Sequence, residues 1–304
     1  MGARITAPRL EGAVTVRRGR KLGFAEFGAP GGRPIVWLHG TPGARRQLPE
    51  SARLAATADG VRLIGIDRPG TGYSTNHLYE SILDFVDDLR MVFDALALDQ
   101  AAVIGLSGGG PYALAAGYGL ADRVPVVGVL GGVAPTRGDD GVSGGLVGFA
   151  DRFAPLLPVF RVPIGGLLTA LIQGIKPIGL QALALYARIS PPGDQIVFAD
   201  PDIQEMFLDD LTGRRQQLRA PANDIVLFTR PWGFSVRDIR VPVKWWHGDS
   251  DNIVPLSHGE RMVELLPDAE LFIRPGESHL GGFAAAEEVL KTLIAAWDAA
   301  DARS

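Results

Sequence analysis

The 304-residue sequence predicts an α/β fold, in which helices flank a mostly parallel central sheet. Short apolar runs alternate with amphipathic helical patterns up to residue 133, and the alternation resumes at residue 241. The residues between have a different composition, rich in Gly, Pro and Leu. Hydrophobic residues make up 46% of the chain and charged residues 21%, as in packed globular proteins. We therefore expect one α/β core that is interrupted by an insertion.

Each predicted strand is a short apolar run that ends near a turn residue. Before the insertion, we expect two paired opening strands and four buried ones, at residues 14–16, 22–27, 34–40, 61–70, 101–106 and 124–133. Residues 81–98 carry seven apolar side chains at helical spacing, which predicts an amphipathic helix. After the insertion, we expect strands and helices to alternate again, at residues 241–251, 257–266, 269–279 and 284–297.

The predicted insertion covers residues 135–230, and the core is formed by residues 1–134 and 231–304. Its apolar part contains a charge-free run at residues 162–175, which is too short to cross a bilayer. We expect a helical cap over a lipophilic pocket, although a self-packed helical subdomain with no role in ligand binding is an alternative. The apolar side chains of this expected lid are Leu156, Leu157, Val159, Phe160, Leu167, Leu168, Leu171 and Ile172.

The composition excludes several functional classes. The formal net charge is −4 and there is no long basic run, so no nucleic-acid partner is expected. The chain has no cysteine, which excludes disulfides, thiolate metal sites and a cysteine nucleophile. The first residues lack the apolar core of a signal peptide. With no transmembrane segment expected either, a cytoplasmic location is predicted, and the oligomeric state is left open.

The pattern G-x-S-x-G occurs twice, around Ser107 and around Ser143. A nucleophilic serine of this type needs a buried strand before it, a helix after it and small neighbours in the turn. Ser107 has all three, because it follows the apolar run 101–106 and Pro111 suits the first turn of a helix. Ser143 follows the polar turn sequence TRGDDG and has no strand before it. Ser107 is therefore the predicted nucleophile.

A serine nucleophile needs a histidine base and an acid that orients the base. His279 is the favoured base, because it lies in a strand-to-helix loop near the end of the chain, after all other candidate elements. The sequence HGDSDNIVP offers two acids just beyond a strand, and Asp251 is preferred to Asp249. Glu277 is too close in sequence to His279 for this role and is expected to be a loop carboxylate.

Five motifs follow one another along the chain: HGTPG (39–43), DRPGTGYS (67–74), GLSGGGPYAL (105–114), HGDSDNIVP (247–255) and GESH (276–279). In this order they resemble the motifs of the α/β-hydrolase superfamily, in the branch with a helical cap between strands six and seven. The resemblance covers nearly the whole chain except the cap. This branch includes esterases, acylglycerol lipases, proline iminopeptidases, C–C bond hydrolases, cofactor-free haloperoxidases, haloalkane dehalogenases and epoxide hydrolases.

The resemblance implies a role for each site residue: Ser107 is the nucleophile, His279 the base and Asp251 the acid. The backbone N–H groups of Thr41 and Gly108 would form the oxyanion hole. The reaction would be a two-step acyl transfer that requires neither a metal ion nor a cofactor. Activity should fall at acid pH, since a protonated imidazole cannot act as a base.

The resemblance also implies that His39 has a structural role in its loop and that DRPGTGYS shapes the pocket wall. Haloalkane dehalogenases and epoxide hydrolases of this branch have an Asp nucleophile, so a serine argues against both activities. We predict hydrolysis of an ester-like bond in a small substrate with an apolar acyl or aromatic group.

Other activities of the branch remain open. A proline iminopeptidase usually has a bulky aromatic residue where Gly108 stands here, and it would need acidic cap residues such as Glu205, Asp209 or Asp210. A C–C bond hydrolase or a perhydrolase would share the triad. A hydrolase-fold binding protein is the non-enzyme alternative, although such proteins often lack a triad member.

Overall fold

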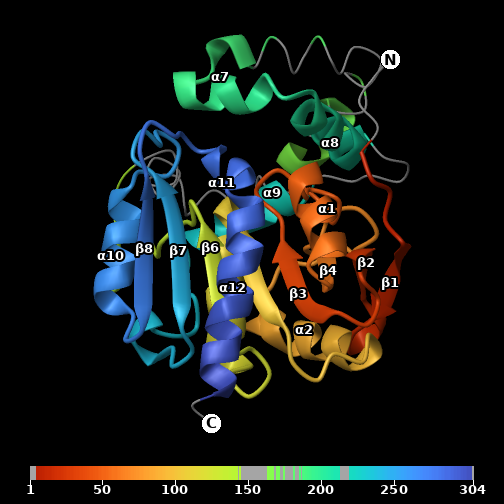
Figure 1. The fold of residues 1–304 in the computed structure, drawn as a ribbon, viewed down its shortest axis with the longest axis vertical. Coiled ribbons are helices and arrows are strands. Elements are labelled where there is room, and N and C mark those ends of the chain that lie inside the picture. The colour runs from red at the N-terminus through yellow and green to blue at the C-terminus, as the bar shows by residue number, and fades with distance from the viewer. Residues whose placement is uncertain are drawn as a thin grey trace.

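An eight-stranded sheet forms the centre of the molecule in the computed structural model (Figure 1). The strand order is β1-β2-β4-β3-β5-β6-β7-β8; β2 pairs antiparallel with β1 and β4, and all other pairs are parallel. The strands are β1 Leu10–Thr15, β2 Lys21–Gly28, β3 Arg33–Leu38, β4 Val61–Ile66, β5 Ala102–Leu106, β6 Val127–Leu130, β7 Val243–Gly248 and β8 Ala269–Arg274. The structure describes residues 5–142, 144, 163–167, 169–171, 174, 181, 185, 187–212 and 219–302.

The inner strands are buried on both faces, which explains their continuous apolar sequences. Strand β3 is an example, since Ile35, Val36, Trp37 and Leu38 are all buried. The predicted fold class, a mostly parallel sheet flanked by helices, is confirmed. The first strand begins at Leu10, earlier than its apolar pattern indicated, because antiparallel pairing with β2 continues beyond the buried positions.

Helices cover both faces of the sheet. On one face α2 and α3 pack with α10 in one hydrophobic cluster, and on the other α1, α11 and α12 pack in a second cluster. These helices are α1 Glu50–Ala58, α2 Asp84–Ala95, α3 Gly110–Gly119, α10 Ser257–Leu265, α11 Gly281–Ala284 and α12 Ala286–Asp301. Within the part of the chain that the structure describes, no helix is long and apolar enough to span a membrane.

The described residues between β6 and β7 include helices α7 Pro192–Phe198, α8 Pro201–Thr212 and α9 Ala220–Phe228. Helices α7 and α8 lie above the C-terminal edge of the sheet, at the top of Figure 1, and α9 lies below them, closer to the strands. Leu227 and Phe228 of α9 belong to the same hydrophobic cluster as α2 and α3. The predicted insertion, residues 135–230, thus includes a helix that packs as part of the core.

Candidate active site

Ser107 lies on a sharp turn between β5 and α3. Its φ of 49° falls in the left-handed region, which is uncommon for a residue with a side chain and is a form of local strain typical of functional sites. Gly105 allows the turn to close, since a Cβ there would lie 2.5 Å from the carbonyl oxygen of Gly109. The turn directs the Ser107 side chain into a cavity at the C-terminal edge of the sheet.

The structure brings the three predicted triad side chains together. Nε2 of His279 lies 2.8 Å from Oγ of Ser107, and Nδ1 of His279 lies 2.7 Å from Oδ2 of Asp251. The other carboxylate oxygen of Asp251 accepts hydrogen bonds from the N–H groups of Ile253 and Val254, both at 2.9 Å. With Nδ1–H donated to Asp251, Nε2 of His279 presents its lone pair to Ser107, the arrangement that a general base needs.

The alternative acids lie elsewhere. Asp249 is exposed, and its Oδ1 accepts the N–H of Gly276 at 2.8 Å. Glu277 accepts a hydrogen bond from Nε of Arg274 at 3.0 Å, as a loop carboxylate would. Only Asp251 of these three acids therefore reaches His279.

The two predicted oxyanion-hole residues are in contact. Thr41 follows β3 and Gly108 follows Ser107; a Cβ on Gly108 would lie 2.3 Å from Oγ1 of Thr41. A side chain at position 108 would therefore displace Thr41, so this position requires glycine as long as Thr41 keeps its place. Thr41 borders the same cavity as Ser107, and Gly108 directly follows Ser107.

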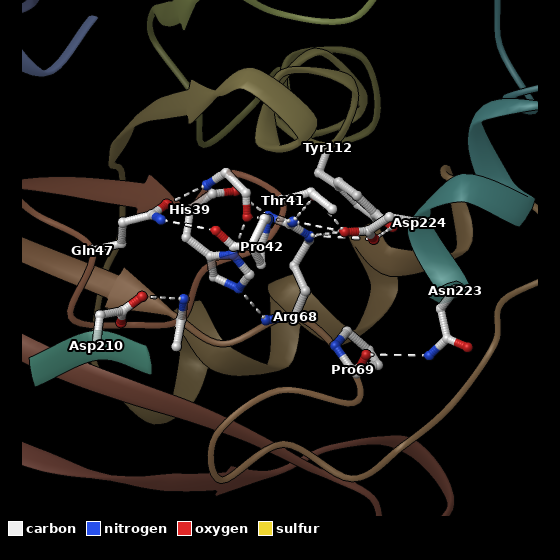
Figure 2. Close-up of polar contacts among 12 residues, drawn as sticks. His39, Thr41, Pro42, Gln47, Arg68, Pro69, Tyr112, Asp210, Asn223 and Asp224 are labelled. Carbon is white, nitrogen blue, oxygen red and sulfur yellow. Dashed lines mark hydrogen bonds and ion pairs between the residues drawn. The ribbon is translucent and has the colours of Figure 1, made fainter. Parts of the chain in front are cut away.

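His39 stabilises the loop before Thr41, as the resemblance implied. Its Nδ1 lies 2.7 Å from the carbonyl oxygen of Gly40, and the N–H of Arg68 donates to its Nε2 at 3.1 Å (Figure 2). Burial and the charge of Arg68 lower the pKa of His39 well below its ordinary value. The imidazole is therefore neutral, and both of its ring nitrogens form hydrogen bonds. His39 thus has a structural role in the loop and no free nitrogen for proton transfer.

The cavity at Ser107 has a volume of about 280 Å³ and a mainly apolar lining. Its walls include three phenylalanine rings, with centroids 5.4 Å apart for Phe198 and Phe207 and 5.5 Å apart for Phe207 and Phe283. The lining residues are Gly40, Thr41, Pro42, Gln47, Leu106, Ser107, Phe198, Phe207, Ile253, His279, Leu280 and Phe283.

The apolar lid residues expected from sequence do not form these walls in the described structure. Leu167 and Leu171 are exposed and do not border the cavity, and the other six lie outside the described residues, as does Ser143. The insertion contributes Phe198 and Phe207 instead. Phe207 lies in a charged stretch that has the composition of a solvated helix. Its role in the cavity wall is therefore visible only in the structure, where it lies opposite the core.

Two carboxylates of the insertion hold these aromatic residues near the core. Asp194 of α7 accepts the N–H of Leu280 at 2.8 Å, and Asp210 of α8 accepts the N–H groups of Ala44 and Arg46 at 2.8 and 3.2 Å. Burial raises the pKa of both, to about 7 for Asp210. Asp194 and Phe198 lie about one helical turn apart, as do Phe207 and Asp210. In each pair the ring lines the cavity and the carboxylate accepts hydrogen bonds from a core loop.

The acidic residues considered for a peptidase pocket do not border the cavity. Asp209 forms an ion pair with Arg46 at 2.9 Å, and Asp210 binds the same segment through the backbone. Glu205 is likewise absent from the cavity lining in the described structure. Within the described residues, no group of three or more His, Cys, Asp or Glu side chains could hold a metal ion.

The model of the alpha/beta hydrolase family matches residues 35–292, which includes all five motifs. The chain belongs to the alpha/beta hydrolase family. The family expected from the resemblance is therefore confirmed. This match identifies a hydrolase but does not specify its substrate.

Individual relatives have several activities. The chain is 28% identical over 271 residues to a non-heme haloperoxidase of Rhodococcus erythropolis, which covers 88% of this chain and 92% of the relative. It is 25% identical to a 2-hydroxy-6-oxo-2,4-heptadienoate hydrolase of Pseudomonas putida, with 86% and 87% coverage. An esterase structure from Exiguobacterium antarcticum is similar in fold, with a TM-score of 0.68, 20% identity and coverage of 95% and 100%.

Proposed function

We propose that this protein is a serine hydrolase that cleaves an ester-like bond of a small substrate with an apolar acyl or aromatic group. The observation that carries the proposal is the continuous hydrogen-bonded series from Ser107 through His279 to Asp251, with spacings of 2.8 and 2.7 Å, at the base of an apolar cavity. The strained turn at Ser107 supports it independently, because such backbone strain is typical of functional residues.

The reaction follows from the hydrogen bonds of these residues. His279 Nε2 removes the proton from Ser107 Oγ as the oxygen attacks the substrate carbonyl, and Asp251 stabilises the imidazolium that forms. The N–H groups of Thr41 and Gly108 donate to the developing oxyanion, each contributing on the order of 3 kcal/mol. The leaving alcohol takes the proton from His279. Water, deprotonated by His279, then cleaves the acyl-enzyme.

The cavity lining supports a neutral, apolar substrate. None of the described lining residues is Asp, Glu, Lys or Arg, so an ionised substrate group would be buried there without a partner of opposite charge. The amide of Gln47 is already engaged, since it accepts the N–H of Gly40 and donates to the carbonyl of Pro42. This lining disfavours the carboxylate of a dienoate and the ammonium group of a peptide N-terminus.

A cofactor-free perhydrolase is the second candidate, favoured by the full-length similarity to a haloperoxidase. It would use the same acyl-enzyme, with hydrogen peroxide in place of water as the second nucleophile. Peracid formation from acetate and hydrogen peroxide would distinguish this activity, and its absence would leave hydrolysis alone.

Fluorophosphonate labelling tests the proposed nucleophile, with Ser107→Ala and Ser143→Ala as a matched pair. We expect labelling and nitrophenyl ester hydrolysis to disappear in Ser107→Ala, by about 10⁴-fold or more, and to be unchanged in Ser143→Ala. Labelling that persists in Ser107→Ala contradicts the assignment. A series of nitrophenyl esters of increasing chain length tests the substrate class, and a strict preference for charged or peptide substrates would contradict it.

A further inference from the structure

One buried carboxylate joins three segments that are far apart in the sequence. Asp224 lies on α9, within the insertion, and its two oxygens accept hydrogen bonds at 2.7 Å from Tyr112 Oη, Thr41 Oγ1 and Arg68 Nη2 (Figure 2). Asp224, Arg68 and Tyr112 are all at most 1% exposed. Thr41 follows β3, Arg68 follows β4 and Tyr112 lies on the helix after Ser107. The insertion is thus bonded to three of the five motifs.

Arg68 extends these contacts along the loop before Thr41. Its guanidinium donates to the carbonyl oxygens of His39 and Gly40, the latter at 3.0 Å, and to Thr41 Oγ1 at 2.7 Å. A planar guanidinium has several donors in fixed directions, so it loses less side-chain freedom for each hydrogen bond that it forms. Arg68 therefore defines the path of the backbone that leads to the Thr41 N–H.

The buried cluster contains one negative charge, on Asp224, and one positive charge, on Arg68, which compensate each other. Asp224 is the acid paired with Arg68, and removal of one partner of a buried ion pair leaves the other uncompensated. Burial and the charge of Asp224 raise the pKa of Tyr112 well above its ordinary value, so its hydroxyl remains a donor. The Thr41 hydroxyl accepts from Arg68 and donates to Asp224, which leaves it one orientation.

We propose that Asp224 is a positioning residue of the oxyanion hole: it holds Arg68 and the Thr41 hydroxyl so that the backbone N–H of Thr41 points at the substrate oxygen. The inference rests on the proposed function. It assigns α9 a part in catalysis, whereas α7 and α8 provide cavity walls. Because a misplacement of about 1 Å in a catalytic group lowers rates about 100-fold, a rigid support for this loop has a direct kinetic consequence.

The protein contains a matched control for Asp224. Asp88 of α2 is also fully buried. It accepts a hydrogen bond from the hydroxyl of Tyr79 at 2.6 Å and forms an ion pair with Arg20 at 2.8 Å. Neither Asp88 nor its partners border the cavity at Ser107. Substitutions of Asp88 and Asp224 therefore disturb similar interactions. Of the two residues, only Asp224 contacts Thr41, which is proposed to contribute to the oxyanion hole.

The test compares Asp224→Asn with Asp88→Asn by kcat and KM for a nitrophenyl ester, by the inhibition constant of an aryl trifluoromethyl ketone and by Tm. The ketone forms a tetrahedral oxyanion with the serine, so its affinity reports the oxyanion hole. In Asp224→Asn we expect kcat to fall about 10- to 100-fold, the inhibition constant to rise by a similar factor and KM to stay within about threefold. Asp88→Asn should lower Tm and leave kcat within about twofold.

Thr41→Val and Thr41→Ser provide a second test if Asp224→Asn fails to fold. Both keep the backbone N–H, but only serine keeps the hydroxyl, so we expect kcat of Thr41→Val to be about tenfold lower than kcat of Thr41→Ser. Equal kcat in the two Thr41 variants, or equal effects of Asp224→Asn and Asp88→Asn on kcat and inhibition, overturns the inference alone. If fluorophosphonate does not label Ser107 in the wild type, the proposed function fails and this inference fails with it.

Discussion

The core and the insertion contribute to the cavity in different ways. The core provides the side chains proposed to react, Ser107 and His279, and hydrogen bonds join the loops that follow β5, β7 and β8. From helices α7 and α8 come two aromatic rings, Phe198 and Phe207, which touch the cavity but carry no group that can react. Under the proposed function, the core cleaves the bond with support from Asp224 of α9, whereas α7 and α8 select the substrate, so mutations in α7 and α8 should change selectivity separately from rate.

The largest effect is expected in the core, from Asp251, the acid of the proposed triad. In Asp251→Asn the amide favours the wrong tautomer of His279, and kcat should fall about 10⁴-fold with little change in KM. Asp249→Asn is the control two residues away, and its activity should be close to that of the wild type because Asp249 binds Gly276 instead. Steady-state hydrolysis of a nitrophenyl ester measures both, and a larger loss in Asp249→Asn would reverse the assignment.

A smaller effect, on selectivity rather than on rate, is expected in the insertion. Phe207→Ala removes a ring from the cavity wall and makes room for a longer acyl chain. We expect kcat/KM for a long-chain ester relative to the acetate to rise about tenfold, with kcat for the acetate nearly unchanged. If both esters lose activity by the same factor, Phe207 contributes to stability or chemistry and the separation between the two regions fails.

The smallest effect on activity is expected at Asp210, which concerns stability and the attachment of α8 to the core. Asp210 has a pKa of about 7 in the folded protein and an ordinary value of 3.8, so the folded state binds this proton more tightly. Its contribution to the free energy of unfolding is therefore fully present below about pH 4 and is lost as the pH rises through about 7. The difference between the two pKa values corresponds to at most about 4 kcal/mol of the free energy of unfolding.

Asp210→Asn tests this sign, because asparagine resembles the protonated form at every pH. In urea denaturation, the variant should be about as stable as the wild type at pH 4.5 and more stable at pH 8. A stability difference that does not change between these pH values would show that Asp210 does not titrate in this range. The comparison with wild type at each pH cancels the contributions of the other carboxylates.

The sequence by itself determined the parts of the site that depend on local order. A strand, a small-residue turn and a helix predicted Ser107 as the nucleophile, and the position of His279 in a late strand-to-helix loop predicted the base. These features lie within short segments, and the structure brings the two side chains together. The choice of Asp251 over Asp249 could be favoured but not decided, since both follow the same strand and only the packing of the β8 loop against β7 separates them.

Only the tertiary structure decided what the insertion contributes. Asp224 is 183 residues from Thr41 and 112 from Tyr112, and Phe207 lies in a stretch whose charge pattern indicates a solvated helix. No local sequence pattern distinguishes a carboxylate that is solvated by water from one that forms an ion pair with a buried arginine. The physical reason is that burial and ion pairing depend on neighbours in space, and the hydrogen-bond partners of Asp224 lie more than 100 residues earlier in the chain.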